Sequence, residues 1–372
     1  MPQLLPDQVA ICCQPENNDA KLERLRDLLE MINDPTFEYT EELVPRLMDV
    51  VTANVLRSLP DPPPSFEPDE DRPRLIPEWD HLEVVYELLY EILDASIPPR
   101  VIKQYITSTF CTQLLAILQS EDPRERVKVA TTLHKIYAKF KSLRQHIRRS
   151  FIHILMQYVE YAPTGYPFGI SELLEVLSSI IKGFATPLQS EHIELLTKTL
   201  LPLLKLSLRH YNQPLLLCMT SFVEKDPKLA SVMLDYLVKC WPKQSTAKQI
   251  LYLNAIEEIL ETAPVESLPN ETKTKLTHVV AKCLESDHFQ VAERTLFLWN
   301  SSQLINYSIF NPSHTRVVLP ILFPSLMVAF KEHWNITVRM LAHSVLEMYT
   351  KHDNMTYQIC LSQYKKAHAT VA

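Results

Sequence analysis

Basic side chains gather in the stretch 123–149, which holds nine Lys and Arg residues and a single acid, Glu125, for a net charge of +8. The whole chain, in contrast, has a formal charge of −7. Arg144 and Arg148 stand four residues apart, so in a helix their guanidinium groups would project from one face. Paired guanidinium groups suit carboxylates and phosphates. The chemistry to expect here is therefore the binding of an anion.

An apolar stripe predicts that this basic stretch is helical. Its members fall three or four residues apart and are Val127, Ala130, Leu133, Tyr137 and Phe140. Ser120 or Asp122 can cap the start of the helix, and Pro123 suits its first position. We therefore expect the positive charge to be displayed on a folded helix that faces a partner.

Apolar and polar anchors for a peptide follow if successive helices stack in chain order. Tyr137 offers a flat apolar surface with a polar tip, as many interface anchors do. Val176 and Ile180, four residues apart, would complete a branched-aliphatic pocket. Gln189 and His192 fall at the start of a helix, where backbone N–H groups and the helix dipole favour an anion. Such a groove suits a peptide with an aliphatic residue followed closely by acids.

Each of these side chains also has an ordinary structural explanation. A tyrosine at helical spacing is more often a core residue than a peptide anchor, and paired arginines often form a solvated face. The histidines have no Cys, His or Asp neighbours at the spacing of a metal site. Only their joint occurrence favours binding.

The scarcity of glycine argues against catalysis. The chain has three glycines, Gly165, Gly169 and Gly183, whereas phosphate-cradling loops and nucleophile elbows need glycines at fixed offsets. We expect a protein that is not an enzyme and that carries no catalytic residues, no metal and no cofactor.

The cysteines and the apolar segments indicate the compartment. The seven cysteines are odd in number and include no C-x-x-C pair, which is typical of reduced thiols in a cytoplasmic or nuclear protein. The N-terminus lacks the pattern of a signal peptide. The most apolar uncharged stretch, 317–330, is too short to span a bilayer. We expect no membrane insertion.

Helical periodicity and proline punctuation predict an all-α fold. Apolar stripes such as Val44, Leu47, Val51 and Val55 recur along the chain, and two helices with their turns fill about 40–47 residues, the HEAT-type period. The expected architecture is a HEAT-like solenoid of helical hairpins with roughly eight repeats over 19–358, between an N-terminal extension (1–18) and a C-terminal tail (359–372). A non-repeating helical bundle is the alternative.

The segment 60–80 stands apart because prolines and acids crowd it and exclude a helix. It is either a solvated connecting loop or an ordered acidic loop that contacts a partner protein. Its apolar members, including Phe66 and Trp79, favour the second interpretation.

Several long stretches resemble, in one collinear register, the B-prime (B56-type) regulatory subunits of protein phosphatase 2A. They are EDPRER at 121–126, TTLHKIYAKF at 131–140, LRQHIRR at 143–149, ISELLEVLSSIIKGFATPL at 170–188, CWPK at 240–243, HFQVAERTLFLWN at 288–300 and LPILFPSL at 319–326. The resemblance implies a stack of HEAT-like hairpins that binds the phosphatase scaffold and catalytic subunits. It also implies recruitment of substrate proteins through acidic-hydrophobic peptides of the Leu-x-x-Ile-x-Glu type.

The same resemblance implies a set of peptide-contacting residues. They are Thr131, His134, Lys135, Tyr137, Arg144, Arg148, Glu175, Val176, Ile180, Gln189 and His192. Three depart from the family's common pattern: Lys135 stands where Arg is usual, Val176 where Ile is usual, and Gln189 where Lys is usual. These departures predict weaker binding and less dependence on ligand phosphorylation.

Two other functions fit parts of the sequence. One is a helical-repeat nucleic-acid adaptor that uses the basic stretch, although the acidic chain and the lack of recurring basic residues argue against it, so we expect no nucleic-acid partner. The other is a solenoid adaptor unconnected with a phosphatase. Co-purification of scaffold and catalytic subunits would separate both from the phosphatase regulator.

Overall fold

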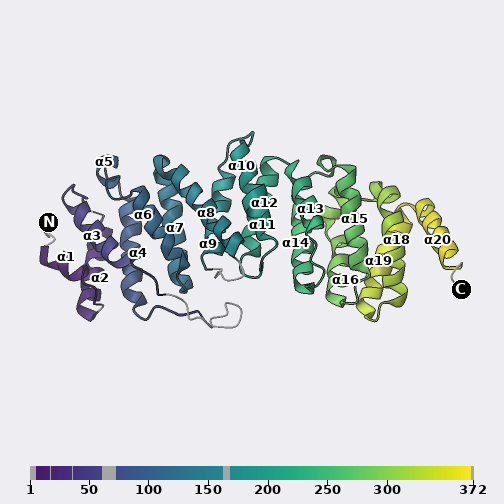
Figure 1. The fold of residues 1–372 in the computed structure, drawn as a ribbon, viewed down its shortest axis with the longest axis horizontal. Helices are drawn as coiled ribbons and strands as arrows, with labels where there is room; N and C mark the ends of the chain where they lie inside the picture. Colours follow the sequence, from purple (N-terminus) through teal and green to yellow (C-terminus); the bar gives the residue numbers. More distant parts are fainter. Residues whose placement is uncertain (1–5, 17, 36, 61–72, 162–167, 370–372) are drawn as a thin grey trace. The chain divides into compact units, whose positions relative to one another are not determined.

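The computed structural model describes residues 6–369 except 17, 36, 61–72 and 162–167, and every regular element in these residues is a helix (Figure 1). The predicted all-α solenoid class is confirmed. The chain divides into two compact units, 1–179 and 180–372, which are described separately. The number of repeats stays a prediction.

The first unit contains these helices: α1 (Pro6–Cys12), α2 (Asp19–Asn33), α3 (Leu43–Val55), α4 (Trp79–Asp94), α5 (Pro99–Ile102), α6 (Ser108–Ala116), α7 (Pro123–Lys139), α8 (Arg144–Tyr161) and most of α9 (Ile170–Lys182). Helix α4 packs between α2 and α7, and α6 packs against α7 and α8. Each helix thus contacts near neighbours in the chain, as in a stack of hairpins.

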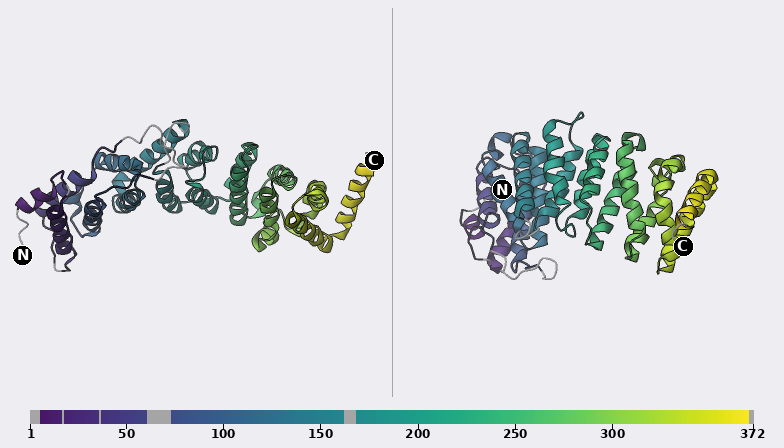
Figure 2. Two further views of the ribbon diagram at one scale, coloured as in Figure 1. Left: turned by 90° about the horizontal axis from the view of Figure 1, so that it is seen from below. Right: turned by 45° about the vertical axis from the view of Figure 1, so that its right-hand side comes forward.

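The second unit contains α10 (Ser190–Glu194), a π-helical turn at Leu195–Leu200, α11 (Leu201–Leu203), α12 (Asn212–Lys225), α13 (Leu229–Lys239), α14 (Thr246–Thr262), α15 (Asn270–Leu284), α16 (Phe289–Leu296), α17 (Ser302–Tyr307), α18 (Thr315–Glu332), α19 (Ile336–His352) and α20 (Asn354–Ala369). Its helices form two layers: α12, α14, α16 and α19 pack in succession, and so do α13, α15, α18 and α20. Figure 2 shows these helices following one another in chain order.

The apolar stripe of α3 is buried, as its periodicity predicts. On α3, Val44, Leu47, Val51 and Val55 are fully buried. They recur at intervals of three and four residues, so one face of the helix is removed from water. Removing a side chain of this size from water stabilises the fold by about 1.5–3 kcal/mol.

The basic helix buries most of its predicted stripe. Ala130, Leu133 and Phe140 are buried and Tyr137 is half-buried, whereas Val127 is 55% exposed. The expected start is right, because Asp122 caps α7 and Pro123 occupies its first position. Val129 and Ile136 are also buried, so the buried face of the helix is wider than the predicted stripe.

Helices also lie within the predicted N-terminal extension and C-terminal tail. Helix α20 runs to Ala369 and buries Cys360 and Tyr364, so helical packing continues beyond residue 358. At the other end, α1 buries Val9 and Cys12. Most of the acidic proline-rich segment, 61–72, lies outside the described residues, as do residues 162–167.

One glycine is required where α9 begins. Gly169 has φ of 77°, a conformation that L side chains rarely adopt. A Cβ at this position would clash with the carbonyl oxygen of Leu118. The absence of a side chain therefore allows the chain to pass close to the end of α6.

Candidate peptide-binding surface

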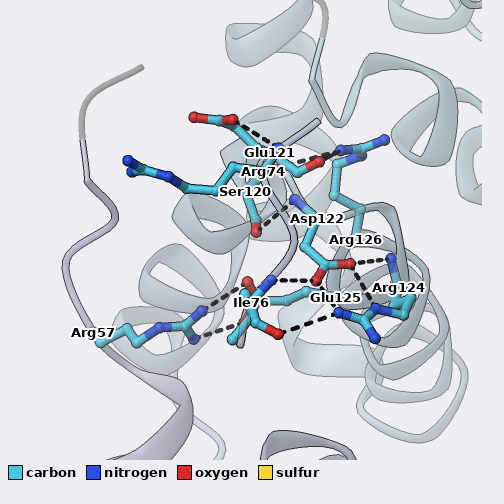
Figure 3. A network of polar contacts seen from close by, with 9 residues as sticks. All are labelled: Arg57, Arg74, Ile76, Ser120, Glu121, Asp122, Arg124, Glu125 and Arg126. Carbon is cyan, nitrogen blue, oxygen red and sulfur yellow. Dashed lines mark hydrogen bonds and ion pairs between the residues drawn. The ribbon is translucent and has the colours of Figure 1, made fainter. Parts of the chain in front are cut away.

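The first turn of α7 is fixed by a polar network (Figure 3). The carboxylate of Asp122 accepts hydrogen bonds from the backbone N–H groups of Arg124 at 2.9 Å and Ile76 at 2.8 Å. The Arg124 guanidinium lies 2.7 Å from the same carboxylate. Arg124 and the segment before α4 are thus tied to the cap of α7.

Glu125, the one acid of the basic stretch, is fully buried. The Arg57 guanidinium donates to its two oxygens at 2.6 and 2.8 Å, and the Tyr86 hydroxyl donates at 3.0 Å. The next basic residue, Arg126, pairs at 2.7 Å with Glu172 of α9. The start of α7 is therefore locked to α3, α4 and α9 through charged groups.

Three lysines of α7 face the acidic side of α4. Lys128 lies 3.6 Å from Glu83 and 3.3 Å from Glu87. Lys135 pairs with Asp94 at 2.7 Å. The Lys139 ammonium donates to the carbonyl of Ala95 at 2.8 Å, at the end of α4.

The expectation that the charge of the whole basic stretch faces a partner is therefore wrong. Most of these cations are matched within the chain, because the lysine spacing on α7 complements the acid spacing on α4. Lys141 and Arg149 remain exposed. Arg144 and Arg148 have a different role.

Arg144 and Arg148 both contact Tyr137. The Arg144 side chain donates to the backbone carbonyls of Tyr137 at 2.9 Å and Ala138 at 3.0 Å, and its guanidinium carbon lies 5.2 Å from the centre of the Tyr137 ring. Arg148 donates to the Tyr137 hydroxyl at 3.2 Å. The three side chains form one half-buried cluster, which we call the Tyr137 cluster.

The other predicted residues of the first unit lie at different depths. Thr131 and His134 are exposed on α7, and the Thr131 hydroxyl donates to the Val127 carbonyl at 2.9 Å. On α9, Val176 is 6% exposed. Glu175 is exposed as a residue, but its carboxyl group is partly removed from water. This desolvation, together with the nearby Glu172, raises the pKa of the carboxyl group.

Gln189 and His192 form a reciprocal cap at the start of α10, in the second unit. The Gln189 side chain accepts from the His192 backbone, and the Gln189 backbone N–H donates to His192 Nδ1 at 3.3 Å. The His192 ring stacks on Phe184, with centroids 3.8 Å apart. The predicted helix start is present, but its N–H groups are partly used by this cap, so it is less suited to an anion than expected. Ile180 is buried at 4% exposure.

The structure thus brings together Tyr137, Arg144 and Arg148, whereas the side chain of Lys135 turns from α7 to residues of α4. Sequence reasoning missed Tyr90 and Asp94, the α4 residues that hold Lys135. A signal was available, since Glu87 and Asp94 stand seven residues apart, as do Lys128 and Lys135, so each pair lies on one helix face.

Among the residues that the structure describes, no group of three or more His, Cys, Asp or Glu side chains is placed to hold a metal ion. Among the described helices, none is both long and apolar enough to cross a bilayer.

A family model described as "Protein phosphatase 2A regulatory B subunit (B56 family)" matches residues 12–372. The theta isoform of the Arabidopsis thaliana phosphatase 2A 57 kDa B' regulatory subunits is 37% identical and covers 96% of this chain and 75% of its own length. The human 56 kDa regulatory subunit delta isoform is 38% identical over 93% of this chain and 58% of its own length. A crystal structure of an engineered protein covers 92% of this chain and 77% of its own at 15% identity, with a TM-score of 0.37, too low to add to the argument.

The fold and these similarities define a helical-repeat regulatory protein. The chain belongs to the B56 family of protein phosphatase 2A regulatory B subunits. It is a non-catalytic member of the phosphatase system.

Proposed function

We propose that this chain binds the scaffold and catalytic subunits of phosphatase 2A and recruits substrate proteins to them. Recruitment uses acidic-hydrophobic peptides of the Leu-x-x-Ile-x-Glu type. Family membership supports the first part. The Tyr137 cluster carries the second, because it combines an aromatic surface with two cations.

The cluster has the chemistry that such a peptide requires. An aliphatic side chain packs on the half-buried Tyr137 ring, and a neighbouring carboxylate reaches a guanidinium group. Arg144 uses its Nε and one Nη for backbone carbonyls, whereas a guanidinium has five N–H donors. Donors therefore remain for a ligand. The ring is already held by the arginines, which reduces the entropy lost on binding.

The pairing of the α7 lysines weakens the nucleic-acid alternative. Lys128, Lys135 and Lys139 are directed to acids or carbonyls of α4. A protein that follows a phosphate backbone needs several cations available to phosphates.

We also propose that the chain acts in the cytoplasm and nucleus, which imaging of the tagged full chain would test.

Reconstitution tests the phosphatase partnership. The purified chain is mixed with scaffold and catalytic subunits and analysed by size-exclusion chromatography. We expect one complex that contains all three chains. Elution of this chain apart from both subunits would contradict the proposal.

Calorimetry with an acidic Leu-x-x-Ile-x-Glu peptide tests recruitment. Hydrogen bonds to charged groups contribute about 1.5–3 kcal/mol each, so Arg144→Glu with Arg148→Glu should weaken binding well over tenfold. Arg149→Glu is the matched control, because Arg149 is exposed on the same helix. Equal affinities for the double variant and the parent would place the peptide elsewhere. Circular dichroism checks that each variant is folded.

A further inference from the structure

The side chain of Lys135, a residue of α7, makes three contacts with residues of α4. Its ammonium nitrogen lies 2.7 Å from Asp94 Oδ2, 3.3 Å from the Tyr90 carbonyl oxygen and 3.1 Å from the centre of the Tyr90 ring. An ammonium group has three N–H donors, and three contacts are enough to occupy them. The Lys135 side chain is only 15% exposed, so its charge is directed away from solvent.

The two partners are more exposed than the lysine. The Asp94 side chain is 63% exposed and Tyr90 is 38% exposed. An anion that approaches Lys135 therefore meets a positive and a negative charge 2.7 Å apart, with the negative one more accessible. The net attraction is small, because the two Coulomb contributions oppose each other.

We propose that Tyr90 and Asp94 are specificity-determining residues: by holding Lys135 on α4 they remove the preference for an added phosphate, so the surface accepts unphosphorylated acidic peptides. This inference rests on the proposed function. On this inference, the selectivity between phosphorylated and unphosphorylated peptides arises from α4 as well as from the lysine at position 135.

The alternative is that these contacts serve helix packing alone, as those of Lys128 and Lys139 do. Lys135 differs from both because it is one of the residues that the resemblance in sequence implies as peptide contacts. Packing alone predicts that releasing Lys135 changes stability but leaves the choice between peptides unchanged. The two explanations therefore differ in a measurable ratio.

The experiment compares two Leu-x-x-Ile-x-Glu peptides that differ only by serine or phosphoserine between the leucine and the isoleucine. Calorimetry on the full chain gives the ratio of their affinities. We expect the parent to prefer the phosphopeptide by less than about threefold. Asp94→Asn should raise the preference to about tenfold, since one ion pair at a partly exposed site changes affinity by roughly this factor.

Variants of Tyr90 provide an independent test and a matched control. Tyr90→Leu removes the ring and should raise the phosphopeptide preference, whereas Tyr90→Phe keeps the ring and should behave as the parent. Adding Lys135→Gln to Asp94→Asn should return the ratio to the parent value. This reversal would show that the gain comes from the released lysine.

The outcomes separate the two proposals. If the parent binds neither peptide, the proposed function fails, and this inference fails with it. If both peptides bind in a manner that needs Arg144 and Arg148, but neither Asp94→Asn nor Tyr90→Leu changes the ratio, only this inference is overturned. A parent that already prefers the phosphopeptide tenfold would overturn it as well.

Discussion

The carboxylate of Glu125 is fully buried and accepts two hydrogen bonds from the guanidinium of Arg57. The two residues are 68 positions apart in the chain, so this pair ties the end of α3 to the first turn of α7. The Tyr86 hydroxyl completes the site from α4. Three helices thus depend on one buried carboxylate.

Arg57→Ala should destabilise the chain substantially. It leaves Glu125 buried without its cation, and breaking a buried pair costs about 3–5 kcal/mol. The Arg57 side chain is 30% exposed, so water can replace part of the interaction and we expect about 2–3 kcal/mol. Urea unfolding measures the difference. Arg24→Ala, which removes an exposed pair with Asp27, should cost less than about 1 kcal/mol.

Asp122 should make stability depend on acid pH. Burial raises the pKa of this carboxyl, but hydrogen bonds from the Arg124 side chain and from the Ile76 and Arg124 backbones outweigh burial, and the net pKa lies below its ordinary value of 3.8. A lowered pKa in the folded state stabilises the fold above 3.8 and loses that contribution as the pH falls through the folded value. Asp122→Asn should therefore be less stable than the parent at pH 7.

The gap between the parent and Asp122→Asn should shrink as the pH is lowered below 3.8. Unfolding midpoints measured from pH 7 to pH 3 would show this convergence. Asparagine still caps a helix, so the difference reports the charge of Asp122. A gap that stays constant with pH would contradict the assignment.

Tyr137→Phe should separate the two parts of the Tyr137 cluster. The change removes the hydroxyl that accepts from Arg148 but keeps the ring. One such hydrogen bond contributes about 0.5–1.5 kcal/mol, so peptide affinity should fall about two- to tenfold. Tyr137→Ala removes the ring as well and should weaken binding further. Calorimetry with the unphosphorylated peptide compares the two, and equal losses would mean that the ring itself contributes nothing.

Tyr349 provides a test in the second unit. The Trp299 indole donates to the Tyr349 hydroxyl at 3.1 Å, and both side chains are buried. Tyr349→Phe leaves the indole N–H without an acceptor, which should cost about 1–3 kcal/mol.

Alkaline pH supplies a second signature of Tyr349. Burial raises the pKa of its hydroxyl above the ordinary value of 10.0, although the bond from Trp299 opposes this shift. Because the buried neutral phenol resists ionisation, the unfolded chain releases this proton first, so a pH above 10.0 favours the unfolded state. The parent should therefore lose stability above pH 10 more steeply than Tyr349→Phe, which has no such proton to release. Parallel losses would contradict this role for Tyr349.

Local pattern was enough to predict the fold class and many buried faces. The stripe Val44, Leu47, Val51 and Val55 is confirmed because burial of α3 follows from its own periodicity. On α7 most of the predicted stripe is buried, but Val127 is exposed, and this helix also turns charged side chains towards α4. The pairing of Lys135 with Asp94 contributes to its orientation, and the apolar pattern of α7 alone does not contain that information.

Spacing along the sequence predicts which candidate residues share a helix face, but it does not predict their contacts. That Arg144 and Arg148 share a face follows from their spacing. That both turn to Tyr137 depends on how α7 and α8 meet. Gln189 and His192 were correctly placed at a helix start, yet their mutual capping depends on side-chain geometry that spacing does not give.

Arg57 and Ile76 are both joined to the first turn of α7, through Glu125 and Asp122 (Figure 3). The two ends of the stretch between them are therefore both held at the start of α7. The free energy of closing a loop rises by only about 0.6 kcal/mol for each doubling of its length. The length and composition of the acidic segment can consequently vary while the stacking of α3, α4 and α7 stays the same.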